Sequence, residues 1–169
     1  AGHHALVTAA AKENDEVLLY VSLSDRKRKG ELPIYGSDMQ TVWKEEIEKI
    51  LPGNVAPVYG GVPIRSVYEV LQDAESKIVE TDKLEHVYTV YSDPVDTARN
   101  FGEAQRQKYF PTAWSRGHIL FAAEENPAAF TRGEGTPNIS GTALRQSLDA
   151  CDLDAFKAGM PKGVDSEKI

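Results

Sequence analysis

The residues best suited to chemistry lie in the stretch 139–145, Ile-Ser-Gly-Thr-Ala-Leu-Arg. Ser140 or Thr142 can cap a helix that begins here, so two hydroxyls and several free backbone N–H groups gather at one helix N-terminus. Arg145 follows Thr142 by three residues and therefore projects from the same side of that helix. Amides, the positive end of a helix dipole and a guanidinium together suit phosphate oxygens. The alternative is an ordinary capped helix with a solvated arginine, because Ser-x-Thr-x-x-Arg occurs often by chance.

A second candidate lies at the start of the sequence, where Gly2 and His3 precede a good helix-forming run at residues 5–12. A glycine lets the backbone approach a ligand closely, and His3 could then direct its imidazole at a bound phosphate. The adjacent histidines, His3 and His4, could equally be the remnant of a purification tag or surface residues without a role.

A basic cluster follows the apolar run at residues 17–23, and it consists of Arg26, Lys27, Arg28 and Lys29. If that run is a strand of a parallel sheet, the cluster lies at its carboxyl end, where α/β sheets bind their ligands. An anionic substrate would suit such a site. For any single one of these residues, a place in a solvated loop is the better interpretation.

Asp93 has a similar position, after the apolar run at 86–91 and before Pro94, which suits the first position of a helix. The simplest interpretation of Asp93 is a helix N-cap. The functional alternative is a hydrogen-bond acceptor for a substrate, or an indirect ligand of Mg²⁺.

Hydrophobic periodicity predicts the elements that would position these residues. Apolar runs predict strands at 17–23, 55–59, 86–91 and 119–123, with the proline of the second strand on a sheet edge. Amphipathic runs predict helices at about 5–12, 37–51, 64–78, 94–109, 140–151 and 153–159. The expected buried side chains include Val67, Leu71, Ala74, Ile78, Val95, Ala98, Phe101 and Cys151. This alternation is typical of an α/β fold, a parallel sheet with helices on both faces.

Composition limits the class of protein. With 169 residues, we expect one domain at 1–161 and a loose polar tail at 162–169. The net charge of −7 argues against broad binding of nucleic acid or of an anionic membrane. No long apolar run and no signal-peptide pattern is present, so neither a membrane span nor export is expected. The single cysteine, Cys151, excludes an intrachain disulfide and favours a reducing, cytoplasmic compartment.

Taken together, the residues at the two ends of the chain resemble a superfamily of nucleotidyltransferases. The signature of this superfamily is (His or Thr)-x-Gly-His near the start and Ile-Ser-x-Thr-x-x-Arg near the end. Residues 1–3, Ala-Gly-His, match the first motif in part, and 139–145 match the second in full. The basic loop at 24–32 resembles the substrate loop of this group. Residues 151–161 look similar to phage-encoded relatives in particular.

One motif departs from the family pattern. Many members carry Gly-Ser-Asp where this chain has Tyr91, Ser92 and Asp93, so Tyr91 stands in place of the glycine.

The resemblance implies a Rossmann-like parallel sheet of strand order 3-2-1-4-5. The first strand and Gly-rich turn of the family would come before Ala1. We therefore expect the numbering to begin inside a longer protein, with the first strand unseen, cleaved away, or supplied by another chain, including a second copy in a homo-oligomer.

The activity that the resemblance implies is transfer of an NMP group from an NTP to a phosphorylated small molecule such as nicotinamide mononucleotide, with release of pyrophosphate. ATP is expected as the donor in preference to CTP. His3 and Arg145 would be catalytic, and Gly2, Ser140, Thr142 and Arg145 would bind the nucleotide. Arg26, Lys27, Arg28, Lys29 and Asp93 would bind the acceptor. Mg²⁺ would be held by the nucleotide phosphates, with few or no direct protein ligands.

Two alternatives stay open. One is a cytidylyltransferase that acts on a sugar or polyol phosphate. The other is a catalytically inactive module, structural or ligand-binding, within a larger phage protein. The absent first strand and Tyr91 favour the inactive module, whereas the intact Ser140, Thr142 and Arg145 favour an enzyme. A phage-encoded enzyme would work in the host cytoplasm, with neither nucleic acid nor membrane as a partner.

Overall fold

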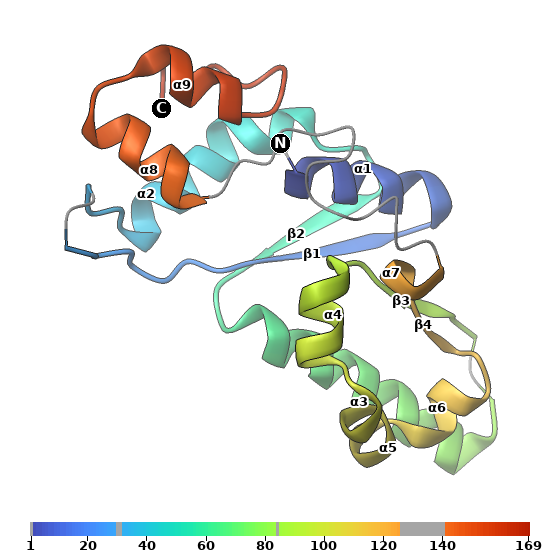
Figure 1. Ribbon diagram of the computed structural model, residues 1–169. Coiled ribbons are helices and arrows are strands. Elements are labelled where there is room, and N and C mark those ends of the chain that lie inside the picture. The colour runs from blue at the N-terminus through green and yellow to red at the C-terminus, as the bar shows by residue number, and fades with distance from the viewer. Residues whose placement is uncertain (1, 30–31, 84, 126–140) are drawn as a thin grey trace. The chain divides into compact units, whose positions relative to one another are not determined.

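Two units make up the part of the chain that the computed structural model describes, residues 2–29, 32–83, 85–125 and 141–169 (Figure 1). Unit 1 comprises Ala1–Gly61 with Gly135–Ile169, and unit 2 is Val62–Glu134. Each unit is described by itself. The single domain expected at residues 1–161 stays a prediction.

Unit 1 contains a parallel sheet of two strands, β1 (Val17–Val21) and β2 (Val55–Tyr59). Gly60 donates its N–H to the carbonyl of Val21 at 3.0 Å, so the alternate residues 56, 58 and 60 direct their N–H groups toward β1. Pro57, which has no N–H, therefore lies on the outer edge of β2. The predicted edge position of this proline is confirmed.

One face of this sheet is more exposed than the sequence predicts. Paired residues of a parallel sheet share a face, and on one face Leu18 is 47% exposed and Val58 40% exposed. On the opposite face Val21 is buried, and Tyr59 contacts Trp43. Within unit 1, the two faces of this strand pair are therefore covered unequally.

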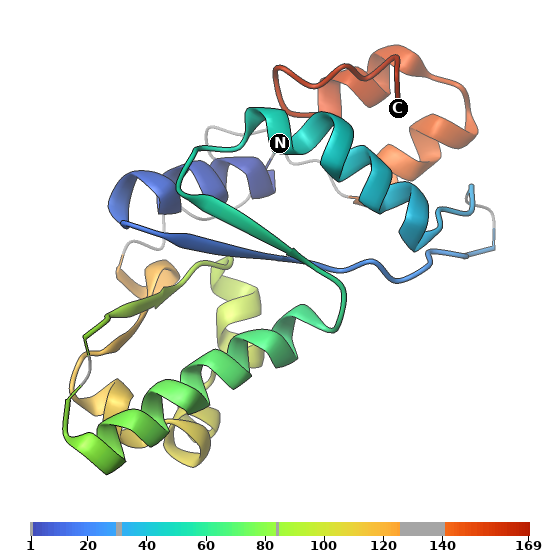
Figure 2. The same cartoon turned by 180° about the vertical axis from the view of Figure 1, so that it is seen from behind.

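Helix α1 (Gly2–Glu13) runs antiparallel to β1, as Figures 1 and 2 show. The side chain of Asn54, next to β2, donates to the carbonyls of Ala11 and Asn14 at 2.9 and 3.0 Å. The carboxyl end of α1 is thereby tied to the amino ends of the strands. Twelve helical residues span about 18 Å, and five strand residues span about 16 Å. The amino end of α1 consequently reaches the level of the carboxyl end of β1.

The helix predicted at 37–51 is a helical run with three geometries. It begins as α2 (Gly36–Val42), widens into the π-helical segment η1 (Trp43–Ile47) and ends as the 3₁₀ segment η2 (Glu48–Ile50). A π-turn rotates the residues that follow it relative to a regular helix, and such turns are frequent at functional sites.

Unit 2 also contains a parallel strand pair, β3 (Tyr88–Val90) with β4 (Ile119–Phe121). The predicted stripe of the long helix α3 (Pro63–Thr81) is confirmed, since Leu71, Ala74 and Ile78 are buried. The described part of this unit also contains the short helices α4 (Pro94–Asn100), α5 (Glu103–Tyr109), α6 (Pro111–Ser115) and α7 (Ala122–Glu125). Its buried core cluster is formed by Leu71, Ile78, Phe101, Phe110, Ala113, Ile119 and Phe121.

The single helix predicted at 94–109 is wrong. The chain leaves helical geometry at Phe101, which has φ −130° and ψ 44°, and α5 begins after Gly102. The hydroxyl of Tyr68 donates to the carbonyl of Asn100 at the break. Phe101 is buried as predicted, at 1% exposed, but Val95 is 65% exposed and does not face the core.

Near the carboxyl end, α8 (Gly141–Asp149) and α9 (Leu153–Gly159) are joined by a tight turn. Cys151 takes the left-handed conformation with φ 54° and is exposed. The predicted burial of Cys151 is wrong, because the helix has ended before this residue.

The described elements form a mixed α/β structure with parallel strand pairs, as the alternation of elements predicts. None of the helices within the described ranges is both long and apolar enough to cross a membrane.

Candidate functional site

The first candidate residues open helix α1. Gly2 is the first residue of the helix, and His3 follows it with an exposed side chain. Since α1 is antiparallel to β1, these residues lie toward the carboxyl edge of the unit 1 sheet. Parallel sheets of α/β proteins bind ligands at this edge.

The basic cluster extends from the same edge. After β1, residues 26 and 34 form an isolated antiparallel bridge. Arg26 donates its N–H to the carbonyl of Ile34 at 2.7 Å, and Ile34 donates its N–H to the carbonyl of Arg26 at 2.9 Å. All four basic residues, Arg26, Lys27, Arg28 and Lys29, are exposed. The loop therefore presents a concentrated positive charge to solvent at the carboxyl end of a strand.

Lys27 contacts an aromatic ring and a carboxylate near the basic loop. Its ammonium lies 4.6 Å from the centroid of the Tyr35 ring and 4.0 Å from Oδ2 of Asp25. The other oxygen of Asp25, Oδ1, accepts the N–H of Gly36 at 2.8 Å. Asp25 thus joins the basic loop to the start of α2, and part of the Lys27 charge is compensated.

Tyr35 and Asp25 are the contributors that sequence reasoning missed. The available signal was weak: an acidic residue just after a strand, and an aromatic residue just before a helix. Their contact with Lys27 depends on the loop folding back on itself, which no local pattern encodes.

Arg145 lies on α8, in unit 1 with His3 and the basic cluster, and its side chain is half-buried. Thr142 is also part of α8, but its side chain lies outside the described structure, and so does Ser140. The predicted pair of hydroxyls stays a prediction.

Asp93 belongs to unit 2, and its contacts favour the simple interpretation. It is the N-cap of α4, where its Oδ1 accepts the N–H of Asp96 at 2.8 Å. Beside it, the hydroxyls of Ser92 and Thr97 lie 2.6 Å apart. The N-cap prediction is confirmed, and the substrate contact predicted for Asp93 stays untested.

A buried arginine in unit 2 also escaped sequence reasoning. Arg106 is 5% exposed, donates through Nε to the carbonyl of Phe101 at 2.6 Å, and forms a bidentate ion pair with Glu124. Its guanidinium lies 3.9 Å from the centroid of the Phe121 ring. Because its nitrogens are engaged within the protein, Arg106 stabilises the fold rather than binding a ligand.

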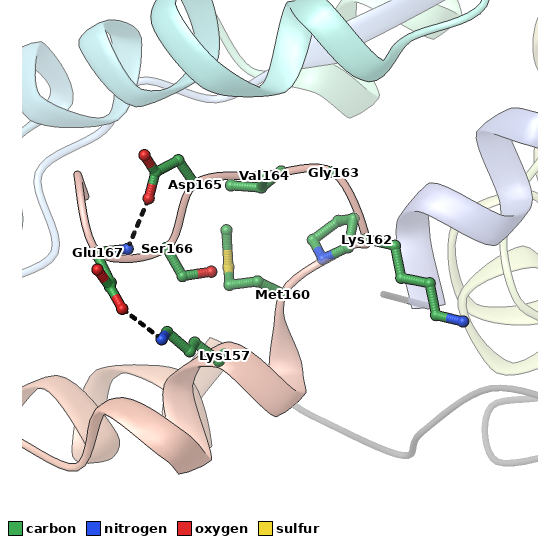
Figure 3. A pocket seen from close by; sticks show the side chains of 9 residues that line it. Lys157, Met160, Lys162, Gly163, Val164, Asp165, Ser166 and Glu167 are labelled. Atoms are coloured by element: carbon green, nitrogen blue, oxygen red, sulfur yellow. Dashed lines mark hydrogen bonds and ion pairs between the residues drawn. The ribbon is translucent and has the colours of Figure 1, made fainter.

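A surface hollow of about 320 Å³ lies beyond α9, lined by residues 157 and 160–167 (Figure 3). None of the predicted site residues lines it. The hollow therefore does not mark the candidate site.

No protein-family model matches the chain, and no curated protein or solved structure is significantly similar to it. The fold and the site define the protein's class as mixed α/β, with a basic loop at the carboxyl edge of a parallel strand pair.

Proposed function

We propose that the protein is a nucleotidyltransferase, which transfers an NMP group from an NTP to a phosphorylated small molecule such as nicotinamide mononucleotide. ATP is the preferred candidate donor, and CTP is the second. The observation that carries the proposal is the antiparallel packing of α1 on β1, which brings Gly2 and His3 to the edge from which the basic loop extends. The sequence motif at 139–145 adds a phosphate-binding stretch to the same unit.

We also propose a Rossmann-like sheet of order 3-2-1-4-5, in which β1 and β2 are the second and third strands and β3 and β4 the fourth and fifth. Within the described residues, β1 pairs with β2 and β3 pairs with β4, each in parallel, as neighbouring strands in that order would. Pro57 prevents regular pairing along the outer edge of β2, so a further strand would join at β1.

In the proposed reaction, a phosphate oxygen of the acceptor attacks the α-phosphorus of the NTP in line. The bond from this phosphorus to the bridging oxygen breaks, and pyrophosphate leaves with the electron pair. His3 donates a hydrogen bond to the triphosphate, and Arg145 neutralises the leaving pyrophosphate. Ser140, Thr142 and nearby amides hold the β- and γ-phosphates. The protein contributes positioning and charge stabilisation.

Mg²⁺ would supply further charge neutralisation between the phosphates. In the described part of the chain, no group of three or more His, Cys, Asp or Glu residues could hold a metal ion. The candidate residues His3, Arg145 and the basic cluster offer nitrogens, whereas Mg²⁺ prefers oxygen ligands. This donor set fits a magnesium ion held through the nucleotide phosphates.

Within the basic cluster, the acceptor phosphate would be bound by Arg26, Arg28 or Lys29. Lys27 is engaged with Tyr35 and Asp25 and would act by holding the loop in place. Arginine at the phosphate contact would add bidentate hydrogen bonding.

The test is pyrophosphate release by the full-length protein across NTPs and phosphorylated acceptors. His3→Ala and Arg145→Ala should each lower kcat/KM by about 10²-fold or more, with little change in thermal midpoint. Arg65→Ala, an exposed change on α3, is the control and should match wild type. Equal rates in wild type and both site variants would refute the assignment.

Calorimetry separates the alternatives. Binding of CTP in preference to ATP would indicate the cytidylyltransferase. The inactive module is favoured by the use of Asp93 as a helix cap, and a failure of both nucleotides to bind, with or without Mg²⁺, would support it.

A further inference from the structure

The segment after α9, residues 160–168, runs back across unit 1 to the π-helical segment η1. At its end, Lys168 places its ammonium 2.9 Å from Oε1 of Glu46 and 3.6 Å from Oε2 of Glu45. Nothing in the local sequence pattern predicts this contact, since more than a hundred residues separate the partners.

Glu46 is an unusual partner for a surface lysine because it is only 5% exposed. A second ammonium, that of Lys49, lies 3.3 Å from the same oxygen. The hydrogen bond from Lys168 is the largest influence on this carboxyl and lowers its pKa from the ordinary value of 4.5. A carboxylate removed from water in this way needs its cations, and Lys168 is the one contributed from a distant part of the chain.

Two further contacts tie down the rest of the segment. Gly163 has φ 91°, and a Cβ built on it would lie 2.9 Å from Cγ2 of Ile50, so the backbone passes directly over η2. Glu167 pairs with Lys157 of α9 at 2.6 Å (Figure 3). The segment is therefore ion-paired to α9 through Glu167 and to both Glu45 and Glu46 of η1 through Lys168.

Helix α8 is joined firmly to α9. At the turn that contains Cys151, the N–H of Asp152 donates to the carbonyl of Ser147 at 2.8 Å, and its Oδ1 accepts the N–H of Ala155 at 3.1 Å. These bonds close the end of α8 and cap the start of α9. Whatever holds α9 in place consequently holds α8, which carries Arg145.

We propose that residues 160–168 form a strap that fixes the α8–α9 pair on the η1–η2 segment, with the Lys168–Glu46 ion pair as its latch. Lys168 is a positioning residue: it acts on the placement of Arg145 through α9. The strap goes beyond the proposed function, because it acts whether or not a nucleotide is bound.

Hydrogen exchange of the full chain, without ligand, tests the strap. Lys168→Gln should speed exchange in α8, α9 and residues 160–169 by about tenfold, the effect of losing one charged hydrogen bond on a local opening equilibrium. Exchange in α3 of unit 2 should not change. The control is Lys162→Gln, since Lys162 is exposed and points away from the segment (Figure 3).

Two more variants sharpen the outcome. Lys168→Arg, which keeps the positive charge, should exchange as slowly as the wild type. Glu46→Gln should accelerate exchange in the same peptides as Lys168→Gln does. The strap proposal would be overturned if Lys168→Gln exchanged these amides at the wild-type rate. It would also be overturned if Lys162→Gln accelerated their exchange as much as Lys168→Gln does. A wild-type protein without nucleotidyl transfer would overturn the proposed function alone, because the exchange measurement needs no turnover.

Discussion

At the scale of single residues, the basic loop depends on backbone segments that lie too close together for most side chains. The tightest approach is at Gly36. A Cβ at this position would lie 1.8 Å from the carbonyl oxygen of Leu23, and the N–H of Gly36 is held by Asp25. The start of α2 is thus pressed against the exit of β1, which sets where the basic loop begins and ends.

Gly36→Ala should therefore destabilise the protein by about 1–3 kcal/mol, the usual cost of overpacking. Urea denaturation measures this change. The matched control is Gly53→Ala, where a Cβ would meet nothing within 4 Å. Similar stabilities of the two variants would contradict the close approach at Gly36.

The Arg106–Glu124 pair gives a second prediction at this scale. Arg106 is buried, whereas the side chain of Glu124 is 55% exposed, so solvent screens the pair in part. Glu124→Ala leaves a buried guanidinium without its carboxylate and should cost about 2 kcal/mol, below the range for fully buried pairs. Thermal or urea unfolding should show no comparable loss for Glu125→Ala, its exposed neighbour on α7.

At the scale of elements, the helices of unit 2 are held at their ends by distant side chains. Glu75, in the middle of α3, accepts the N–H groups of Thr112 and Ala113 at 3.0 and 2.7 Å. The carboxylate caps α6 from another helix and places a negative charge at its amino end.

Removal of this cap should weaken α6. We expect Glu75→Ala to lower the free energy of unfolding by about 1 kcal/mol and to speed exchange of the α6 amides. Glu75→Gln, which keeps an acceptor oxygen, should lose less. Glu69→Ala changes an exposed acid on the same helix and serves as the control. Unchanged exchange of α6 in Glu75→Ala would disprove the cap.

At the scale of the whole molecule, each unit has its own parallel strand pair, and the large aromatic core belongs to unit 2. Phe110→Ala, at a fully buried position, should cost about 3–5 kcal/mol. Hydrogen exchange should then accelerate in α3, β3 and β4 while β1 and β2 keep wild-type rates. The control, Val79→Ala, alters a side chain that is 66% exposed. Equal acceleration in both units would show that they unfold together.

Much of the fold was predictable where hydrophobic periodicity is strong. The strands β1 and β2, the stripe of α3 and the two helices at the carboxyl end follow from local patterns. The break at Phe101 was not predictable, because a buried aromatic side chain and the hydroxyl of Tyr68 override local helix preference there. The left-handed turn at Cys151 was missed for a similar reason, since no glycine marks it.

The sequence by itself determined the candidate chemistry, because phosphate binding depends on residue types and short spacings: Gly2, His3, the basic cluster and Arg145. Only the tertiary structure decided which of these share a unit, that Asp93 caps a helix, and that Lys27 rests on Tyr35. It alone also showed that Lys168 reaches a buried Glu46. The contact between Lys168 and Glu46 joins residues more than a hundred positions apart in the chain, and it forms only when helix packing brings them together.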